Sequence, residues 1–364
     1  MAKRTPLYEQ HVIAGGKMVD FAGWDMPLNY GSQIEEHHVV RTAAGMFDVS
    51  HMVVVDLYGE RVRPFLQHLL ANDVAKLKTA GKALYTCMLK DDGGVIDDLI
   101  VYFMGDEYFR LVVNAGTRDK DLAWIEAQAK AFDVQVTERS DLAMIAVQGP
   151  EAREKVAALM NDSQRAATQD LKVFTAVDLG SIFIARTGYT GEDGYEIMIE
   201  DTQAAGLWDR LIEQGVEPIG LGARDSLRLE AGMNLYGSDM DETTSPLVSG
   251  LGWTVALEPS SRDFIGRAAL ETEKTAGVQQ KLVGLVLQGR GVLRAHQRVL
   301  VNGQAVGETT SGGFSPSLNT SIALARVDVA VMDECQVDVR GKQLNCKVVK
   351  PPFVRKGEAC IELD

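Results

Sequence analysis

The sequence predicts an α+β protein whose last part is a separate, small all-β domain. Two features of the chain carry this prediction. Up to about residue 278, short apolar runs typical of strands are mixed with stretches in which apolar residues recur every three or four positions, the spacing of an amphipathic helix. From about Lys281 onward the chain consists of short β-rich runs such as LVGLVL, RVLVNGQAVGE and CQVDVR. We place the boundary in the polar stretch Thr272–Gln279.

The first half of the chain alternates between helix and strand patterns. Ser32-Gln33-Ile34-Glu35 has the S-x-x-E form of a capping box. We therefore expect a helix from there to about Thr42, with Gly45 as its stop. The other elements expected in this half are strands at Val53–Tyr58, Val95–Phe103 and Phe109–Val113 and a helix at Thr117–Phe132.

The next stretch, up to the boundary, predicts one strand, one hairpin and three helices. The hairpin is formed by Ile182–Arg186 and Tyr195–Ile199, which flank a Gly-rich connection. In the C-terminal domain a second hairpin is expected where Asn302-Gly303 supplies the two residues of a tight turn. The remaining strand and helices are placed at Ala143–Val147, Glu151–Met160, Gln203–Glu213 and Leu221–Ala231.

The charge balance excludes one class of partner. The 364 residues include 37 Lys+Arg and 51 Asp+Glu, which gives a formal net charge of −14, and no run of five or more basic residues interrupts this balance. A chain this acidic repels nucleic acid and anionic lipid. We therefore expect neither a nucleic-acid partner nor a membrane partner.

Cysteine usage and the lack of long apolar segments predict a cytoplasmic protein. The four cysteines form no CxxC pair, so neither a zinc ribbon nor a redox dithiol is indicated, and a reduced compartment fits best. The N-terminal MAKRTPLYEQH lacks the apolar core of a signal peptide. No stretch approaches the roughly 20 apolar residues that a transmembrane helix needs.

Two adjacent carboxylates stand inside an apolar run, GGVIDDLIVYF, at residues 93–103. Side chains alternate between the faces of a strand, so Asp97 and Asp98 point to opposite faces, each among apolar neighbours. At least one of them then lies in a partly desolvated setting, which raises the pKa of a carboxyl group and suits a base or a charge stabiliser. The alternative is a bulge or a turn after Gly93-Gly94, with both acids bonded to the backbone.

The Gly-rich stretch RTGYTGEDGYEI, residues 186–197, is a candidate ligand loop. Its glycines permit close approach of the backbone to a ligand, but without a GK[ST] ending it is not a phosphate-binding loop. Glu196 sits in the following strand and faces away from Tyr195 and Ile197. An inward carboxylate there suits a ligand with two adjacent N–H donors. The alternative is a solvent-facing Glu on an edge strand.

A cation opens the predicted helix in GLGARDSLRLEAG, residues 220–232. The glycine pattern is a poor match to a dinucleotide-binding loop, because Asp225 replaces the third glycine and no good strand precedes it. Arg224 in the first turn opposes the helix dipole, which makes sense if it faces an anion. An Asp225–Arg228 surface pair needs no such ligand. The histidines His37, His38 and His51 form no metal-binding spacing, so no metal is expected.

Six blocks in order along essentially the whole chain resemble one family, the glycine cleavage system T-protein. They are VDFAGWDMPLNYGSQIEEHHVVR, GMFDVSHM, GGVIDDLIVY, RTGYTGEDGYEI, GLGARDSLRLEAGMNLYGSDMDE and TSGGFSPSLNTSIALARV. The resemblance implies three domains arranged as a cloverleaf around a central channel for folate, the C-terminal one a small β-barrel. It implies a division into residues 1–50 with about 140–278, an inserted segment at about 51–139, and about 280–364.

The resemblance also implies an activity. A T-protein is a tetrahydrofolate-dependent aminomethyltransferase. It takes the aminomethyl group from the lipoyl arm of the H-protein and gives its methylene to tetrahydrofolate. Ammonia, 5,10-methylenetetrahydrofolate and dihydrolipoyl H-protein are the products. The implied partners are the lipoylated H-protein and, indirectly, the P- and L-proteins of the system; tetrahydrofolate is the acceptor substrate, and no metal is implied.

The family's critical residues fall on positions of this sequence. The critical aspartate falls on Asp98, and Asp97 is then structural. Glu196 matches the acid that grips the pterin, whose N3–H and amino group present two donors. The other folate-pocket positions carried over are Tyr85, Asn114, Tyr189 and Arg224.

Two relatives of this fold have other roles. The folate domain of dimethylglycine and sarcosine dehydrogenases follows a flavin-binding domain, for which we expect no room because the fold starts at residue 1. A folate-binding factor linked to iron–sulfur proteins carries a Cys-containing motif where this chain reads RLEAGMNLYGSDMDE, without cysteine. A transferase is therefore the reading we prefer.

Overall fold

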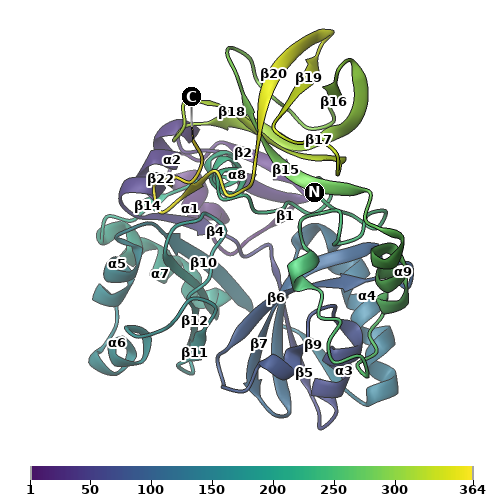
Figure 1. Cartoon of the computed structure of the whole chain (residues 1–364). Helices are drawn as coiled ribbons and strands as arrows, with labels where there is room; N and C mark the ends of the chain where they lie inside the picture. The colour runs from purple at the N-terminus through teal and green to yellow at the C-terminus, as the bar shows by residue number, and fades with distance from the viewer. Residues whose placement is uncertain (1, 363–364) are drawn as a thin grey trace.

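The computed structural model describes residues 2–362, which form three lobes (Figure 1). Two lobes are built on open sheets, and the third, formed by the last part of the chain, is a closed β-barrel. This is the mixed α+β fold with a C-terminal barrel that the sequence predicted. No helix within residues 2–362 combines the length and the apolar character needed to cross a bilayer.

The first lobe is a six-stranded sheet in the order β11-β12-β13-β10-β4-β14, with helices on both faces. On one face α5 and α7 pack, where Trp208 and Leu211 meet Ile145 and Ile197 in a core of their own. On the other face lie α2 and α8. The bounds are α2 Gln33–Thr42, β4 Gly45–Asp48, β10 Leu142–Gln148, α5 Ala152–Ala158, α6 Asp162–Thr168, β11 Ala176–Asp178, β12 Ile182–Ala185, β13 Gly194–Glu200, α7 Asp201–Glu213, β14 Glu217–Pro218 and α8 Leu221–Glu230.

The second lobe is a five-stranded antiparallel sheet in the order β6-β7-β8-β5-β9. One face carries α3 and α4, whose Phe65 and Ile125 join Leu99 and Val101 in the core of this lobe. The other face turns toward the first lobe, where Tyr102 belongs to a core shared by both sheets. The bounds are β5 Val53–Tyr58, α3 Val62–Leu69, β6 Ala83–Leu89, β7 Val95–Gly105, β8 Tyr108–Val113, α4 Arg118–Ala129 and β9 Gln135–Glu138.

The third lobe is a barrel in the order β15-β18-β17-β16-β19-β20, filled by residues such as Leu285, Val299 and Ala323. Asn302 and Gly303 join β16 to β17 with positive φ of 52° and 77°, which confirms the predicted hairpin turn. The bounds are β15 Gln280–Leu287, β16 Arg298–Val301, β17 Gln304–Ser315, β18 Thr320–Asp328, β19 Glu334–Val339 and β20 Lys342–Val349.

Short elements at the two ends of the chain complete the fold. An N-terminal three-stranded sheet, in the order β1-β3-β2, leads into the first lobe, and a C-terminal hairpin returns to it from the barrel. A helix, α9, precedes the barrel. The bounds are β1 Lys3–Arg4, α1 Tyr8–Ile13, β2 Met18–Phe21, β3 Trp24–Pro27, α9 Arg267–Ala276, β21 Val354–Arg355 and β22 Glu358–Ala359.

The polar stretch in which we placed the boundary is largely the last part of α9, and 277–279 connect this helix to β15, the first strand of the barrel. One predicted helix stop is wrong. Gly45 does not stop α2 but opens β4. A Cβ there would lie 2.4 Å from Cγ1 of Ile219, so this glycine is needed for close packing. Ser32 does cap α2, since its hydroxyl accepts from the amide of Glu35 at 3.3 Å.

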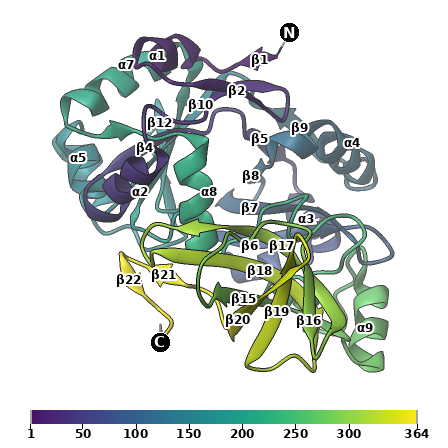
Figure 2. The same cartoon turned by 90° about the horizontal axis from the view of Figure 1, so that it is seen from above.

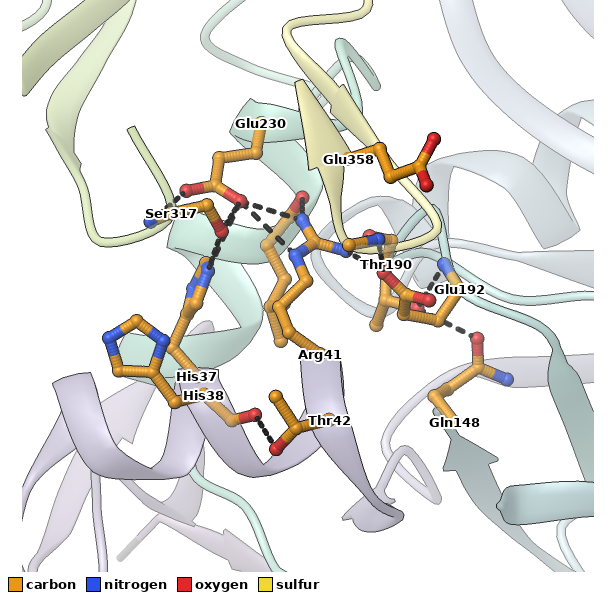
Figure 3. A network of polar contacts seen from close by, with 12 residues as sticks. His37, His38, Arg41, Thr42, Gln148, Thr190, Glu192, Glu230, Ser317 and Glu358 are labelled. Atoms are coloured by element: carbon orange, nitrogen blue, oxygen red, sulfur yellow. Dashed lines mark hydrogen bonds and ion pairs between the residues drawn. The ribbon is translucent and has the colours of Figure 1, made fainter. Parts of the chain in front are cut away.

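A buried polar network joins the barrel to the first lobe at the end of α8 (Figure 3). Glu230 accepts from Arg41 of α2 at 2.8 Å and from the Ser317 hydroxyl of the β17–β18 turn at 2.8 Å. His37 lies 3.1 Å from the same carboxylate. Burial alone would raise the pKa of Glu230, but His37, Arg41 and hydrogen bonds lower it to about 2. The network therefore fixes one end of α8 with a charged, fully buried carboxylate.

Candidate functional site

Three of the expected site residues lie together, one on β6, one on β7 and one directly after β8. Asp98 of β7 accepts a hydrogen bond from the Tyr85 hydroxyl of β6 at 2.7 Å. Its other oxygen accepts from the amide of Asn114, directly after β8, at 3.0 Å. Antiparallel pairing across the three strands brings these side chains together although they stand up to 29 residues apart in the chain. The Asp98 carboxyl is thus held at both oxygens.

The setting of Asp98 suits a group that titrates near neutral pH. Burial and the nearby charge of Asp97 raise the pKa of Asp98 to about 7, while the hydrogen bonds from Tyr85 and Asn114 act in the opposite direction. Asp98 keeps a small exposed fraction, in contrast to Asp97. It can therefore contact a ligand as a carboxylate, which stabilises a positive charge and can accept a proton.

Alternation along β7 gives the two aspartates different surroundings. Asp97 shares its face with Leu99 and Val101, which belong to the core of the second lobe, and it is 0% exposed. Both of its oxygens accept from Asn114, one from the backbone amide at 3.0 Å and one from the side-chain amide at 2.9 Å. Asp98 shares its face with Tyr102, in the core between the two sheets. The Asp98 face is thus the one that looks toward the first lobe.

Arg224 and Tyr189 lie on the first lobe. The guanidinium of Arg224 stands 4.8 Å from the ring centroid of Tyr189 and 5.9 Å from that of Phe47. Within residues 2–362 it forms no ion pair and no side-chain hydrogen bond, and burial lowers the pKa of Arg224. Burial is the main cause that raises the pKa of the Tyr189 phenol, and the charge of Asp98 raises it further, so the two side chains lie near each other. Tyr189 therefore lies between Arg224 and the Asp98 group.

Glu196 lies on the face of β13 that is turned away from Tyr195 and Ile197, both buried under α5 and α7. One of its oxygens accepts from the Thr187 hydroxyl at 2.5 Å. Its charge acts on Arg224, so the two side chains are neighbours without forming an ion pair. The other oxygen of Glu196 receives no hydrogen bond from the described part of the chain. A carboxylate and a guanidinium thus stand side by side with hydrogen-bonding capacity to spare.

The Gly-rich loop owes its place to Gln148 of β10. The Gln148 amide donates to the carbonyl oxygen of Thr187 at 3.1 Å. A Cβ on Gly188 would lie 1.9 Å from Oε1 of Gln148, so only glycine lets the loop approach this side chain. The contact fixes Thr187, and with it the hydroxyl that holds Glu196.

A cavity of about 560 Å³ opens between the N-terminal sheet and the second lobe, and none of the expected site residues lines it. Its lining includes Arg4, Ser50, His51 and Met52. His51 is buried and its Nδ1 has no hydrogen-bond partner; burial lowers the pKa of His51 to about 4 against the pull of Asp48. Within residues 2–362 no group of three or more acids, histidines or cysteines is arranged to hold a metal ion.

Three residues near the site were not singled out from the sequence. Trp253 is 67% exposed and stacks on Tyr85 with ring centroids 5.7 Å apart. Thr187 and Asp121 contact Glu196 and Asp97 respectively. A tryptophan in the short segment Gly252–Thr254 was a sequence signal that could have drawn attention to Trp253, whereas no local pattern distinguishes Thr187 or Asp121. Figure 2 shows α8 of the first lobe opposite the strands β7 and β8 of the second lobe, beside the barrel. Residues far apart in the sequence are brought to the same region by this arrangement.

Comparisons with known proteins concern the whole chain and its overall fold. The model of the GCVT N-terminal domain matches residues 7–259, and that of the glycine cleavage T-protein C-terminal barrel domain matches residues 280–355. The chain is similar to the glycine cleavage system aminomethyltransferase T from Bartonella henselae, with 36% identity, a TM-score of 0.92 and coverage of 98% of this chain and 99% of that chain. The heterotetrameric sarcosine oxidase from Corynebacterium sp. U-96, in complex with pyrrole 2-carboxylate, matches with 13% identity and a TM-score of 0.37, covering 58% of this chain and 94% of that chain. Since the first family model alone spans well over half of the sequence, the chain belongs to the glycine cleavage T-protein family.

Proposed function

We propose that this chain is the aminomethyltransferase of a glycine cleavage system. It takes the aminomethyl group from the lipoyl arm of the H-protein and transfers its methylene to tetrahydrofolate. Ammonia is released, and 5,10-methylenetetrahydrofolate and dihydrolipoyl H-protein are formed. The observation that carries this proposal is Asp98, a partly exposed carboxyl held at both oxygens on the face of β7 that is turned toward the first lobe, which carries Arg224 and Glu196.

The first lobe would bind the folate. Glu196 has an oxygen available, and a carboxylate with that capacity suits the adjacent N3–H and amino donors of a pterin ring. Arg224, without an acid partner of its own, would donate to a folate oxygen, and the Tyr189 ring supplies an aromatic surface beside it. These three side chains and Asp98 would then contact one ligand from opposite sides.

The second lobe would handle the charge that develops during transfer. The methylene of the S–CH2–NH3⁺ group becomes cationic as its bond to the ammonia breaks, and a carboxylate beside it stabilises that charge. Asp98 would also accept the proton that a folate amine gives up as its nitrogen bonds to the methylene. The C–S bond then breaks as the second folate nitrogen bonds to the same carbon, and the lipoyl sulfur leaves as the thiol of dihydrolipoyl H-protein. Tyr85 and Asn114 hold the carboxylate in place, so that it does not need to reorganise during the reaction.

Partner and compartment follow the same proposal. The carrier is the lipoylated H-protein, and the P- and L-proteins act on that carrier before and after this step. All four cysteines are free thiols in the structure, which is in keeping with a reduced, cytoplasmic compartment.

Reconstitution tests the proposal. The purified protein is mixed with aminomethyl-loaded H-protein and tetrahydrofolate, and ammonia and 5,10-methylenetetrahydrofolate are measured. We expect both products to form at equal rates and to depend on this protein. A protein that binds tetrahydrofolate tightly but does not increase either product would belong to a binding-only class, and the proposal would be wrong.

A further inference from the structure

Two buried carboxyl groups, those of Asp97 and Asp121, lie on the core side of the second lobe, behind Asp98. Asp121 stands in the first turn of α4 and is 0% exposed, as is Asp97. Neither oxygen of Asp121 receives a hydrogen bond of good geometry from a donor within residues 2–362; its polar neighbours are the carboxyl of Asp97 and the hydroxyl of Thr117. The hydroxyl of Thr117, beside the pair, gives its one proton to the Asn114 carbonyl oxygen at 3.0 Å. Two carboxyl groups thus share one dry site.

Both groups of this pair cannot be ionised, because each has lost its water and the two charges repel. A single proton held between them removes the repulsion and makes a hydrogen bond. Asp97 already accepts two hydrogen bonds from Asn114, which favour its charged form, whereas Asp121 accepts none. The proton therefore sits on Asp121. Burial and the Asp97 charge raise the pKa of Asp121 to about 10.

The charged and titratable groups around the pair leave this assignment in place. On α4, the ammonium of Lys120 is held by the Tyr236 hydroxyl at 2.7 Å and by Glu242 at 2.8 Å. On β6 and β7, the Cys87 thiol and the Asp98 carboxyl lie near Asp97 and add no positive charge. In the described chain, neither member of the pair forms an ion pair with a Lys or an Arg.

Asn114 connects the pair to the reaction site. Its side-chain amide donates to Asp97 at 2.9 Å and to Asp98 at 3.0 Å, and its backbone amide donates to the second oxygen of Asp97 at 3.0 Å. If Asp97 carried the proton, one of its oxygens would become a donor facing the N–H groups of Asn114, and one of these bonds would be lost. A proton kept on Asp121 leaves both oxygens of Asp97 able to accept.

We propose that Asp121 is a positioning residue for the transfer reaction: it keeps its proton at neutral pH and donates a hydrogen bond to Asp97, so that Asp97 stays anionic and keeps the Asn114 amide turned toward Asp98. The kinetic part of this inference rests on the proposed function. The location of the proton does not, since it depends only on the contacts of the three carboxyl groups.

Two substitutions separate positioning from packing. Asp121→Asn keeps a donor at the same place, so kcat stays within about threefold of the parent and the pH dependence is retained. Asp121→Ala removes the donor, so kcat falls by about tenfold while the KM for tetrahydrofolate changes less. In that variant Asp97 takes up the proton, its charge no longer acts on Asp98, and the acid limb of the kcat profile moves to lower pH. Equal losses in both variants with an unmoved acid limb would leave Asp121 a packing residue and overturn the inference.

Infrared spectroscopy reads the proton directly. At pH 8 the parent protein should show the C=O stretching band of a buried, protonated carboxylic acid, and this band should vanish in Asp121→Asn. The matched control is Asp119→Asn, which removes an exposed carboxylate two residues away and should leave the band unchanged. A band that survives in Asp121→Asn, or is missing in the parent, refutes the inference. Absence of transfer activity in the parent protein, with the band present, would instead count against the proposed function.

Discussion

Replacing Asp98 by Asn is the sharpest test of the proposed site, because it removes a charge and almost no volume. The amide oxygen still accepts from Asn114, and its NH2 group stands where the Tyr85 hydroxyl now donates at 2.7 Å. Since a hydroxyl can turn and accept instead, the local structure is retained. What is lost is the carboxylate that would stabilise the cationic methylene and take a proton, a contribution of about 10²–10⁴-fold for general bases. We expect kcat to fall by that factor and tetrahydrofolate affinity to change by less than about threefold.

The assay measures methylenetetrahydrofolate formation from aminomethyl-loaded H-protein, with folate affinity followed separately by calorimetry. Asp97→Asn is the matched control, the same change one residue away on the core face. Its NH2 group would face the N–H donors of Asn114, so the free energy of unfolding should drop by roughly 1–3 kcal/mol. Its kcat per folded molecule should fall less than that of Asp98→Asn. Equal losses of kcat in the two variants would refute the assignment of the Asp98 face to the reaction.

Three further predictions follow from the charges of the site and of the network behind it. In the parent protein, kcat should fall as the pH drops below about 7, because Asp98 acts as a carboxylate and its pKa is about 7; a flat profile from pH 6 to 8 would contradict this. Arg224→Gln should weaken tetrahydrofolate binding by about tenfold in calorimetry while leaving the melting temperature nearly unchanged, since within residues 2–362 Arg224 has no ion pair or side-chain hydrogen bond to lose and gives up only its contacts with the Tyr189 and Phe47 rings; unaltered affinity would remove it from the folate site. Glu230→Gln should cost roughly 3–5 kcal/mol in denaturant unfolding, because it breaks a buried network with Arg41 and His37. Because the folded pKa of Glu230, about 2, lies below its unfolded value, its contribution to stability is present above about pH 5 and is lost as the pH falls toward 2; a parent and a variant with the same acid stability would contradict that sign.

The strand pattern alone predicted the central feature of the site, two aspartates on opposite faces. Period-two alternation is a local property, so GGVIDDLIVYF was enough to separate Asp97 from Asp98. It could not say which face meets the first lobe, because that depends on how two sheets pack. Tyr102, on the Asp98 face, belongs to the core between the sheets and decides the question. Helices α2, α4, α5, α7 and α8 and the hairpin at Asn302-Gly303 were likewise predictable from local patterns, whereas α1, α3, α6 and α9 were not predicted.

What the sequence could not supply are contacts made across the chain. The hydrogen bonds of Asp98 to Tyr85 and Asn114 depend on strand register, and the stacking of Trp253 on Tyr85 joins residues 168 positions apart. Asp121 looked like an ordinary acid in a first helical turn, where helices favour a negative charge. The domain division at residues 1–50 with about 140–278, 51–139 and 280–364 and the roles of the site residues stay predictions for the experiments above.

Helix α8 carries Arg224 in its first turn and Glu230 at its last residue, and the barrel holds that last residue through Ser315 and Ser317. The barrel therefore cannot be removed, or exchanged without regard to this contact, while the first lobe stays intact. Without it, Glu230 would face Arg41 and His37 at a newly exposed surface, and α8 would lose its anchor. Chimeras between family members should tolerate swapped barrels only when the serine-bearing β17–β18 turn travels with a matching Glu230, so this turn sets the rule for recombining the two family domains.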